Sequence, residues 1–191
     1  MRALAAFALL FVAACQPAPQ SYTLSPVTFR SQPVIRINVA KINVVEDYIS
    51  PVSAPNVEHQ MSTPPAQGVK IWVSERLQAV GTSGTLDVVI TNASVKENKL
   101  PVKQGVRGLF TDDQSERYDA NLAVTLRLYD GENAMSRSQG DVNVSRSRTI
   151  NEKASLADRE KLWHDMSTEM VQSYDREAEV RLRQYFANYL R

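Results

Sequence analysis

Strict alternation of apolar and polar side chains between residues 117 and 129 constrains this chain more than any other feature. The apolar set is Tyr118, Ala120, Leu122, Val124, Leu126 and Leu128, and the polar set includes Asp119, Asn121, Thr125 and Arg127. A period of two residues is that of a β-strand, whose successive side chains point to opposite faces of a sheet. One face of this strand must therefore be buried, while the other stays polar. Asp130-Gly131 follows at once and is typical of a hairpin turn.

Three further segments are predicted to complete the sheet. Residues 34–45 form a first strand, in which the alternation shifts after Val39 and so indicates a bulge. Residues 85–95 carry apolar side chains on both faces, which indicates a central strand. Residues 135–148 are more polar, which favours an edge strand or a binding face. The segments 46–62 and 96–115 are predicted to be loops.

A first helix is predicted near residues 63–81. Thr63 would cap it, Pro64 suits its first position, and Gly81 fits its end. Its apolar face consists of Val69, Trp72, Val73, Leu77 and Val80.

A second helix is predicted over about residues 155–190. Ser155 and Asp158 resemble a capping box, and apolar residues keep helical spacing from Leu162 to Tyr189. Such a helix would be about 52 Å long. We expect it to outrun a small sheet, so that it either bends or projects its far end toward a partner.

The element order is therefore β-α-β-β-β-α. We predict an α+β fold with a four-stranded mixed sheet and two helices packed on one face, forming a single domain over residues 34–191. The opposite face of the sheet would be open and polar.

The only cysteine of the chain, Cys15, closes an apolar leader. Residues 1–14 contain Arg2, an apolar stretch and the small pair Ala13-Ala14, as secretory signal peptides do. The stretch is too short to span a bilayer, which needs about 20 apolar residues.

The run Val12-Ala13-Ala14-Cys15 resembles the bacterial lipobox. That resemblance implies that the Cys15 thiol is acylated, with palmitate among the acyl chains, and that cleavage makes it the first residue. Gln16 follows instead of Asp, which by the same resemblance favours the periplasmic face of a Gram-negative outer membrane. Residues 15–33 would form a proline-rich tether. The alternative is an ordinary cleaved signal with an unmodified cysteine.

The charge of the mature chain is balanced. Removal of residues 1–14 leaves 177 residues with 21 basic and 21 acidic side chains. This balance argues against nucleic acid as a partner. With Cys15 acylated no disulfide can form, so packing alone must hold the fold.

The element order and the run from Glu116 to Leu126, followed by a hairpin, a basic strand and a charged helix, resemble LptE-like outer-membrane lipoproteins. That resemblance implies a role in lipopolysaccharide assembly, although no residue matches a lipopolysaccharide-binding residue. Auxiliary lipoproteins of ABC-type lipid transport systems and lipoprotein activators of peptidoglycan synthases are similar at this level.

Catalytic patterns are weak in this sequence. His59 is expected to be exposed in a loop and His164 to lie in a charged helical stretch, so we predict no metal site. The pair Asp112-Asp113 is expected to be a solvated turn, although paired carboxylates can be catalytic. Without a nucleophile elbow or a phosphate loop, we predict neither an enzyme nor a cofactor.

Two groups of residues are candidates for binding. Arg137, Arg146 and Arg148 would either protect an edge strand by their charge or contact an anion such as a lipid phosphate. Tyr185, Phe186 and Tyr189 would be either ordinary core or a surface that docks a partner.

The leading hypothesis is a non-enzymatic, lipid-anchored periplasmic binding module, an accessory or assembly factor for an envelope or outer-membrane complex. It predicts an open polar sheet face and no deep polar pocket. A lipid carrier is the alternative, and it would need an apolar groove between helix and sheet. An enzyme would need a cluster of titratable groups.

Overall fold

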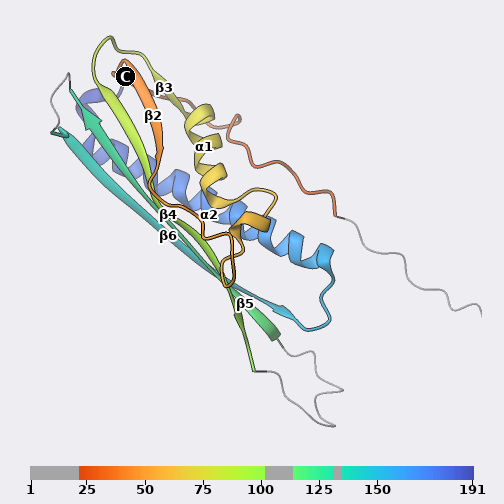
Figure 1. Cartoon of the computed structure of the whole chain (residues 1–191). Helices are drawn as coiled ribbons and strands as arrows, with labels where there is room; N and C mark the ends of the chain where they lie inside the picture. The colour runs from red at the N-terminus through yellow and green to blue at the C-terminus, as the bar shows by residue number, and fades with distance from the viewer. Residues whose placement is uncertain (1–21, 102–113, 131–134) are drawn as a thin grey trace, which may run out of the picture.

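The computed structural model describes residues 22–101, 114–130 and 135–191, and these form the predicted α+β fold. A four-stranded mixed sheet carries both α-helices on one face (Figure 1). Its strands are β2 (Lys41–Glu46), β4 (Thr85–Lys99), β5 (Gln114–Tyr129) and β6 (Ser138–Asn151), and its helices are α1 (Pro65–Arg76) and α2 (Leu156–Tyr185). The sheet order is β2-β4-β5-β6, with β2 parallel to β4 and the other pairs antiparallel. The central position of β4 and the edge position of β6 are confirmed.

The prediction of one bulged strand over residues 34–45 is wrong. The segment forms two strands in two different sheets: β1 (Ile35–Ile37) pairs with β3 (Leu77–Ala79), and β2 pairs with β4. Between the two strands, the amide N–H of Ala40 donates to the carbonyls of Ser83 and Gly84. The shift in the apolar pattern therefore marks a change of sheet.

The first helix is shorter than predicted. It begins at Pro65, Pro64 takes the cap position, and the carbonyl of Thr63 accepts a hydrogen bond from the Ser167 hydroxyl at 2.7 Å. The helix ends at Arg76 because the next three residues pair with β1. Gly81 lies beyond β3, where a Cβ atom would come within 2.7 Å of the backbone at Asn38.

The predicted loop over residues 96–115 is also too long. The strands β4 and β5 extend into it and pair as far as Lys99 and Glu116. A bulge between Ile90 and Asn92 inserts one residue into β4. Ile90 and Ala93 consequently both face the helices, whereas Val89 faces the opposite side of the sheet and is 3% exposed. The 3-10 helix η1 (Glu58–Gln60) lies beside the end of β4.

The capping box at the start of α2 is confirmed: the Asp158 amide donates to the Ser155 hydroxyl at 3.2 Å, and the Ser155 amide donates to the Asp158 carboxylate at 2.9 Å. The helix has 30 residues and a length of about 45 Å. The strand β5 has 16 residues and is about 54 Å long. The prediction that the helix outruns the sheet is therefore wrong. After α2 the chain ends in the 3-10 helix η3 (Ala187–Tyr189).

The core lies between α2 and the sheet. The sheet contributes the register pairs Leu86↔Leu128, Val88↔Leu126, Ile90↔Val124 and Ala93↔Leu122, and α2 contributes Met166, Met170, Val171, Tyr174, Ala178 and Leu182. All of these side chains are at most 1% exposed. The segment before residue 34 joins this core, because Val27 and Phe29 are buried. These two side chains belong to the same hydrophobic cluster as α2 and the sheet.

Candidate functional site

The face of the sheet opposite the helices is a polar surface built from β4, β5 and β6. Asp119 lies near one end of it and accepts hydrogen bonds from Asn98 and Ser147, each at 2.8 Å, and from Arg117 at 3.0 Å. Near the other end the Thr125 hydroxyl donates to Asp141 at 2.8 Å. The bonds from Asn98 and Ser147 to Asp119 and from Thr125 to Asp141 cross between neighbouring strands, whereas Arg117 and Asp119 both belong to β5. We call this surface the open face.

A shallow depression of about 250 Å³ lies in the middle of the open face. Its polar lining consists of Asn92, Asn121, Asn143 and Ser145, which come from three adjacent strands. Asn121 and Ser145 are register partners in β5 and β6, and both are exposed. Each asparagine amide offers two N–H donors and a carbonyl acceptor. The depression can therefore receive polar groups of a partner.

The space between α2 and the sheet is filled with side chains. Leu122 and Leu126 from the sheet meet Met166, Met170 and Leu182 from the helix, all at most 1% exposed. Near the helix end, a Cβ atom on Gly140 would already lie 3.3 Å from side-chain atoms of Arg181 and Tyr185. A lipid carrier would need an apolar groove between helix and sheet, but side chains occupy that space between α2 and the sheet.

The three arginines predicted as anion contacts occupy different environments. Arg137 is exposed and directly precedes β6. Arg146 and Arg148 lie on the helix side of β6, where Arg148 forms an ion pair with Glu169 and Arg146 donates to the hydroxyl of Ser173. The guanidinium groups of Arg146 and Arg148 are thus bonded to α2.

The aromatic residues at the chain end divide between core and surface. Phe186 is completely buried, Tyr189 is partly buried against the core, and Tyr185 is 46% exposed. Phe186 follows the last residue of α2 and belongs to the hydrophobic core, and its amide donates to the carbonyl of Leu182 at 2.9 Å. Of the three, Tyr185 offers the largest exposed surface.

The two histidines, Cys15 and the pair Asp112-Asp113 are the remaining candidates from the sequence. His59 is exposed, as predicted, whereas His164 is 8% exposed and has a buried Nδ1 with no hydrogen-bond partner among the described residues. Within those residues, no cluster of three or more His, Cys, Asp or Glu side chains is arranged to hold a metal ion. Cys15 and the pair Asp112-Asp113 lie outside the described residues. In the described part of the chain, no helix combines the length and apolarity needed to cross a membrane.

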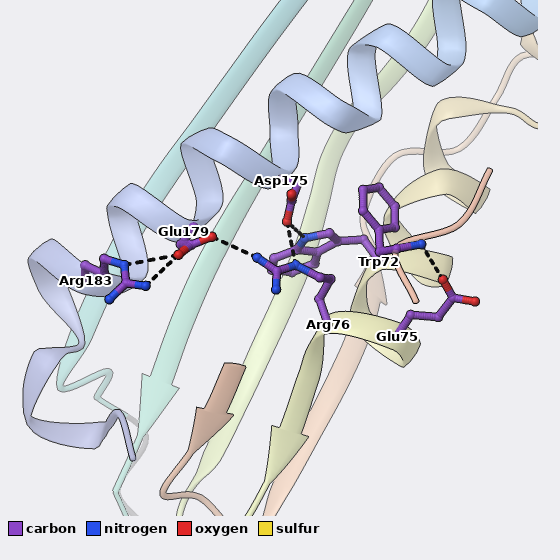
Figure 2. A network of polar contacts seen from close by, with 7 residues as sticks. Trp72, Glu75, Arg76, Asp175, Glu179 and Arg183 are labelled. Carbon is purple, nitrogen blue, oxygen red and sulfur yellow. Dashed lines mark hydrogen bonds and ion pairs between the residues drawn. The ribbon is translucent and has the colours of Figure 1, made fainter. Parts of the chain in front are cut away.

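Sequence reasoning missed a buried arginine. Arg76, the last residue of α1, is 1% exposed and its Nε donates to Asp175 Oδ1 of α2 at 2.8 Å. The same oxygen accepts a bond from Trp72 Nε1 at 2.7 Å, and Arg76 Nη2 donates to Glu179 at 2.8 Å (Figure 2). Arg183 holds the other oxygen of Glu179, and this hydrogen bond lowers the pKa of Glu179. The signal in the sequence was helical spacing, since Arg76 follows Trp72 by four residues on the apolar stripe.

Comparisons with known proteins give structural neighbours only. No protein-family model and no curated protein matches the chain. One solved structure that aligns with it is a lipoprotein B from Nitrosomonas europaea, with 15% identity, coverage of 86% of this chain and 93% of the other, and a TM-score of 0.42.

Two others are the rare lipoprotein B from Shewanella oneidensis (9% identity, coverage 73% and 92%, TM-score 0.38) and a minor lipoprotein from Acinetobacter baumannii (11% identity, coverage 81% and 96%, TM-score 0.36). All three are bacterial lipoproteins by name. Because the TM-scores of these three alignments are 0.42 or less, we transfer no function from these proteins to this chain.

Proposed function

We propose that this protein is a non-enzymatic, lipid-anchored module of the bacterial envelope that binds a protein partner through the open face of its sheet. The open face is the observation that carries the proposal. Both α-helices pack against the other side, so the polar side chains of three long strands remain available (Figure 1).

The chemistry of the open face suits a protein partner. Its asparagine, serine and threonine side chains offer both donors and acceptors, and the bonds around Asp119 and Thr125 hold several of them in place. Ordered side chains lose less conformational entropy when a partner binds. A typical interface between separately folded proteins contains about ten direct hydrogen bonds, to which these donors and acceptors can contribute.

The membrane anchor in the proposal is inferred from the sequence. Acylation of Cys15 would hold the domain at a membrane, and the periplasmic face of the outer membrane is the place that the lipobox resemblance favours. A membrane-held module meets its partner at a raised effective concentration, so a modest contact surface suffices. The proposed role is that of an accessory or assembly factor for an envelope complex.

The alternative of a lipid carrier is less well supported. Side chains from α2 and from the sheet fill the space between these two layers. A whole acyl chain would have to displace buried methionines and leucines such as Met166 and Leu182.

Photo-crosslinking in the native host tests the proposal. A photoreactive residue at position 121, in the depression of the open face, should trap a discrete protein partner when the lipidated full-length chain is illuminated in cells. The matched control is the exposed position 177 on α2. A partner trapped equally at positions 121 and 177, or no trapped partner at position 121, contradicts the proposal.

A charge substitution gives a second readout. Asn121→Arg places a long cation in the depression without touching the core, so the free energy of unfolding should change by less than about 0.5 kcal/mol. Recovery of the crosslinked partner with affinity-tagged protein should fall, whereas Glu177→Arg should leave it unchanged.

A further inference from the structure

A small cavity lies between the beginning of β1, the end of α2 and the last two residues of the chain. Its volume is about 180 Å³. Its apolar lining consists of Pro33, Val34, Ile35, Leu182 and Leu190, and its charged lining consists of Arg36, Arg76, Arg183, Arg191 and Glu179. Four arginines and one carboxylate therefore line this space, and none of them belongs to the lining of the depression on the open face.

Arg76 is the buried member of this lining. Its Nε and Nη2 are used by Asp175 and Glu179. Its Nη1 is buried and has no hydrogen-bond partner among the residues that the structure describes. Figure 2 shows the guanidinium held by α2 carboxylates from one side, with one nitrogen pointing away from Asp175. A buried donor without an acceptor is rare in folded proteins, and a ligand is one explanation for it.

Glu179 and Asp175 offset only part of the positive charge of the cavity, because two carboxylates stand against four guanidinium groups. The two oxygens of Glu179 are held separately, one by Arg183 at 2.6 Å and the other by Arg76 at 2.8 Å. Arg36 and Arg191 add two exposed guanidinium groups at the rim, and the amide of Arg191 donates to the carbonyl of Arg36 at 3.0 Å. The backbone bond keeps these two residues next to each other.

We propose that this cavity binds a phosphate group. Planar guanidinium forks match the oxygen geometry of phosphate, and several arginines together balance its double charge. The cavity is smaller than the roughly 300–1,000 Å³ of sites for drug-sized ligands. It therefore accepts the phosphate group and a short attached segment, with Val34, Leu182 and Leu190 next to the apolar part.

The source of the phosphate is either a small phosphate compound or the headgroup of an anionic lipid. Both present the same group to Arg76, Arg36 and Arg191. They differ in the apolar part, which only the lipid supplies. This inference is independent of the partner proposed for the open face, because it uses none of the residues of that surface.

The indole N–H of Trp72 provides a local reporter, since Trp72 and Arg76 share Asp175 Oδ1. Detergent-solubilised full-length protein, labelled with ¹⁵N at tryptophan, is titrated with inorganic phosphate, with dihexanoyl phosphatidic acid and with dihexanoyl phosphatidylcholine. We expect the Trp72 resonance to shift with the first or second ligand, while that of Trp163, the other tryptophan, stays in place.

Variants at the rim keep the test independent of folding. The double variant Arg36→Gln/Arg191→Gln changes exposed side chains and should weaken binding by about tenfold or more, since each arginine contributes charge-assisted hydrogen bonds. The matched control Arg127→Gln/Arg137→Gln removes the same charge outside the cavity and should change affinity by less than about twofold. Arg76→Lys, which retains a cation but loses the planar fork, should also weaken binding.

Saturation by phosphatidic acid at a tenfold lower concentration than inorganic phosphate would support a lipid headgroup, and equal affinities would support a small phosphate compound. The inference fails if the Trp72 resonance is unmoved by both anions. It also fails if phosphatidylcholine shifts that resonance as strongly, or if the control variant weakens binding as much as the rim variant.

Discussion

The Arg76 guanidinium and the Asp175 carboxylate form an ion pair inside the core, with Nε and Oδ1 2.8 Å apart, and so connect α1 to α2. Both residues are almost excluded from solvent, at 1% and 8% exposure. A buried pair of this kind requires that each charge keep its partner, because an unpaired ion in the core costs several kcal/mol. The same ion pair also holds Arg76, the buried arginine in the lining of the proposed phosphate cavity, in position.

We expect Asp175→Ala to lower the free energy of unfolding by about 3–5 kcal/mol, because it leaves Arg76 without its main counter-charge and Trp72 without an acceptor. Asp175→Asn keeps an acceptor for Trp72 and should cost less. Urea denaturation followed by circular dichroism measures both values. The exposed control Glu177→Ala should shift stability by less than about 0.5 kcal/mol. A loss of similar size in Asp175→Ala and Glu177→Ala would exclude this role of the pair.

The contact between α1 and α2 requires a glycine at position 68. A Cβ atom there would lie 2.4 Å from Cγ2 of Val171, which is fully buried. We expect Gly68→Ala to lower the free energy of unfolding by about 1–3 kcal/mol, although alanine favours the helix itself. The double variant Gly68→Ala/Val171→Ala removes the clash and should be less destabilised than the sum of the two single variants. Additive losses in a thermal or urea series would show that the two positions do not compete for space.

The sequence predicted those elements whose local pattern agrees with their final packing. The alternation from Tyr118 to Leu128 became β5, and the Ser155–Asp158 box begins α2. The strands of the four-stranded sheet and the two α-helices follow in the predicted order, whereas the pairing of β1 with β3 was not predicted. The boundaries at Arg76 and Lys99 did not, because pairing with another strand determines where helix α1 ends and where β4 continues.

The candidate sites were harder to predict, since they depend on residues distant in sequence. Arg76 and Asp175 are 99 residues apart, and no local pattern shows that they meet. Arg148 was predicted as an anion contact from its charge, but its ion pair with Glu169 depends on how α2 crosses β6. The four arginines of the cavity come from β1, the two helices and the chain end, so only the fold brings them together.

The buried carboxylate of Glu58 should make stability depend on pH. Burial raises its pKa, but hydrogen bonds from Tyr48, Val95 and Ser50 outweigh that effect, so the pKa lies below the usual value. A group whose pKa is lowered on folding stabilises the protein above its unfolded pKa, and this contribution is lost as the pH falls through the folded pKa.

We therefore expect Glu58→Gln to be less stable than the wild type at pH 7, and the difference to shrink below about pH 4.3, the ordinary pKa of glutamate. Urea unfolding at a series of pH values measures the difference. Glu177→Gln, at an exposed position, should show no such trend. A constant difference between Glu58→Gln and the wild type from pH 7 to pH 3 would contradict the assignment.

Membrane attachment should depend on Cys15 alone. Cys15→Ser removes the thiol that the lipobox resemblance predicts to be acylated, and the described part of the chain contains no helix able to cross a membrane. We expect the variant to lose incorporation of radiolabelled palmitate and to appear in the soluble fraction. Its domain should keep its unfolding midpoint, because the core begins at Val27 and Phe29. Gln16→Asn is the matched control and should remain anchored. Continued membrane association of Cys15→Ser would show that another part of the chain holds the protein there.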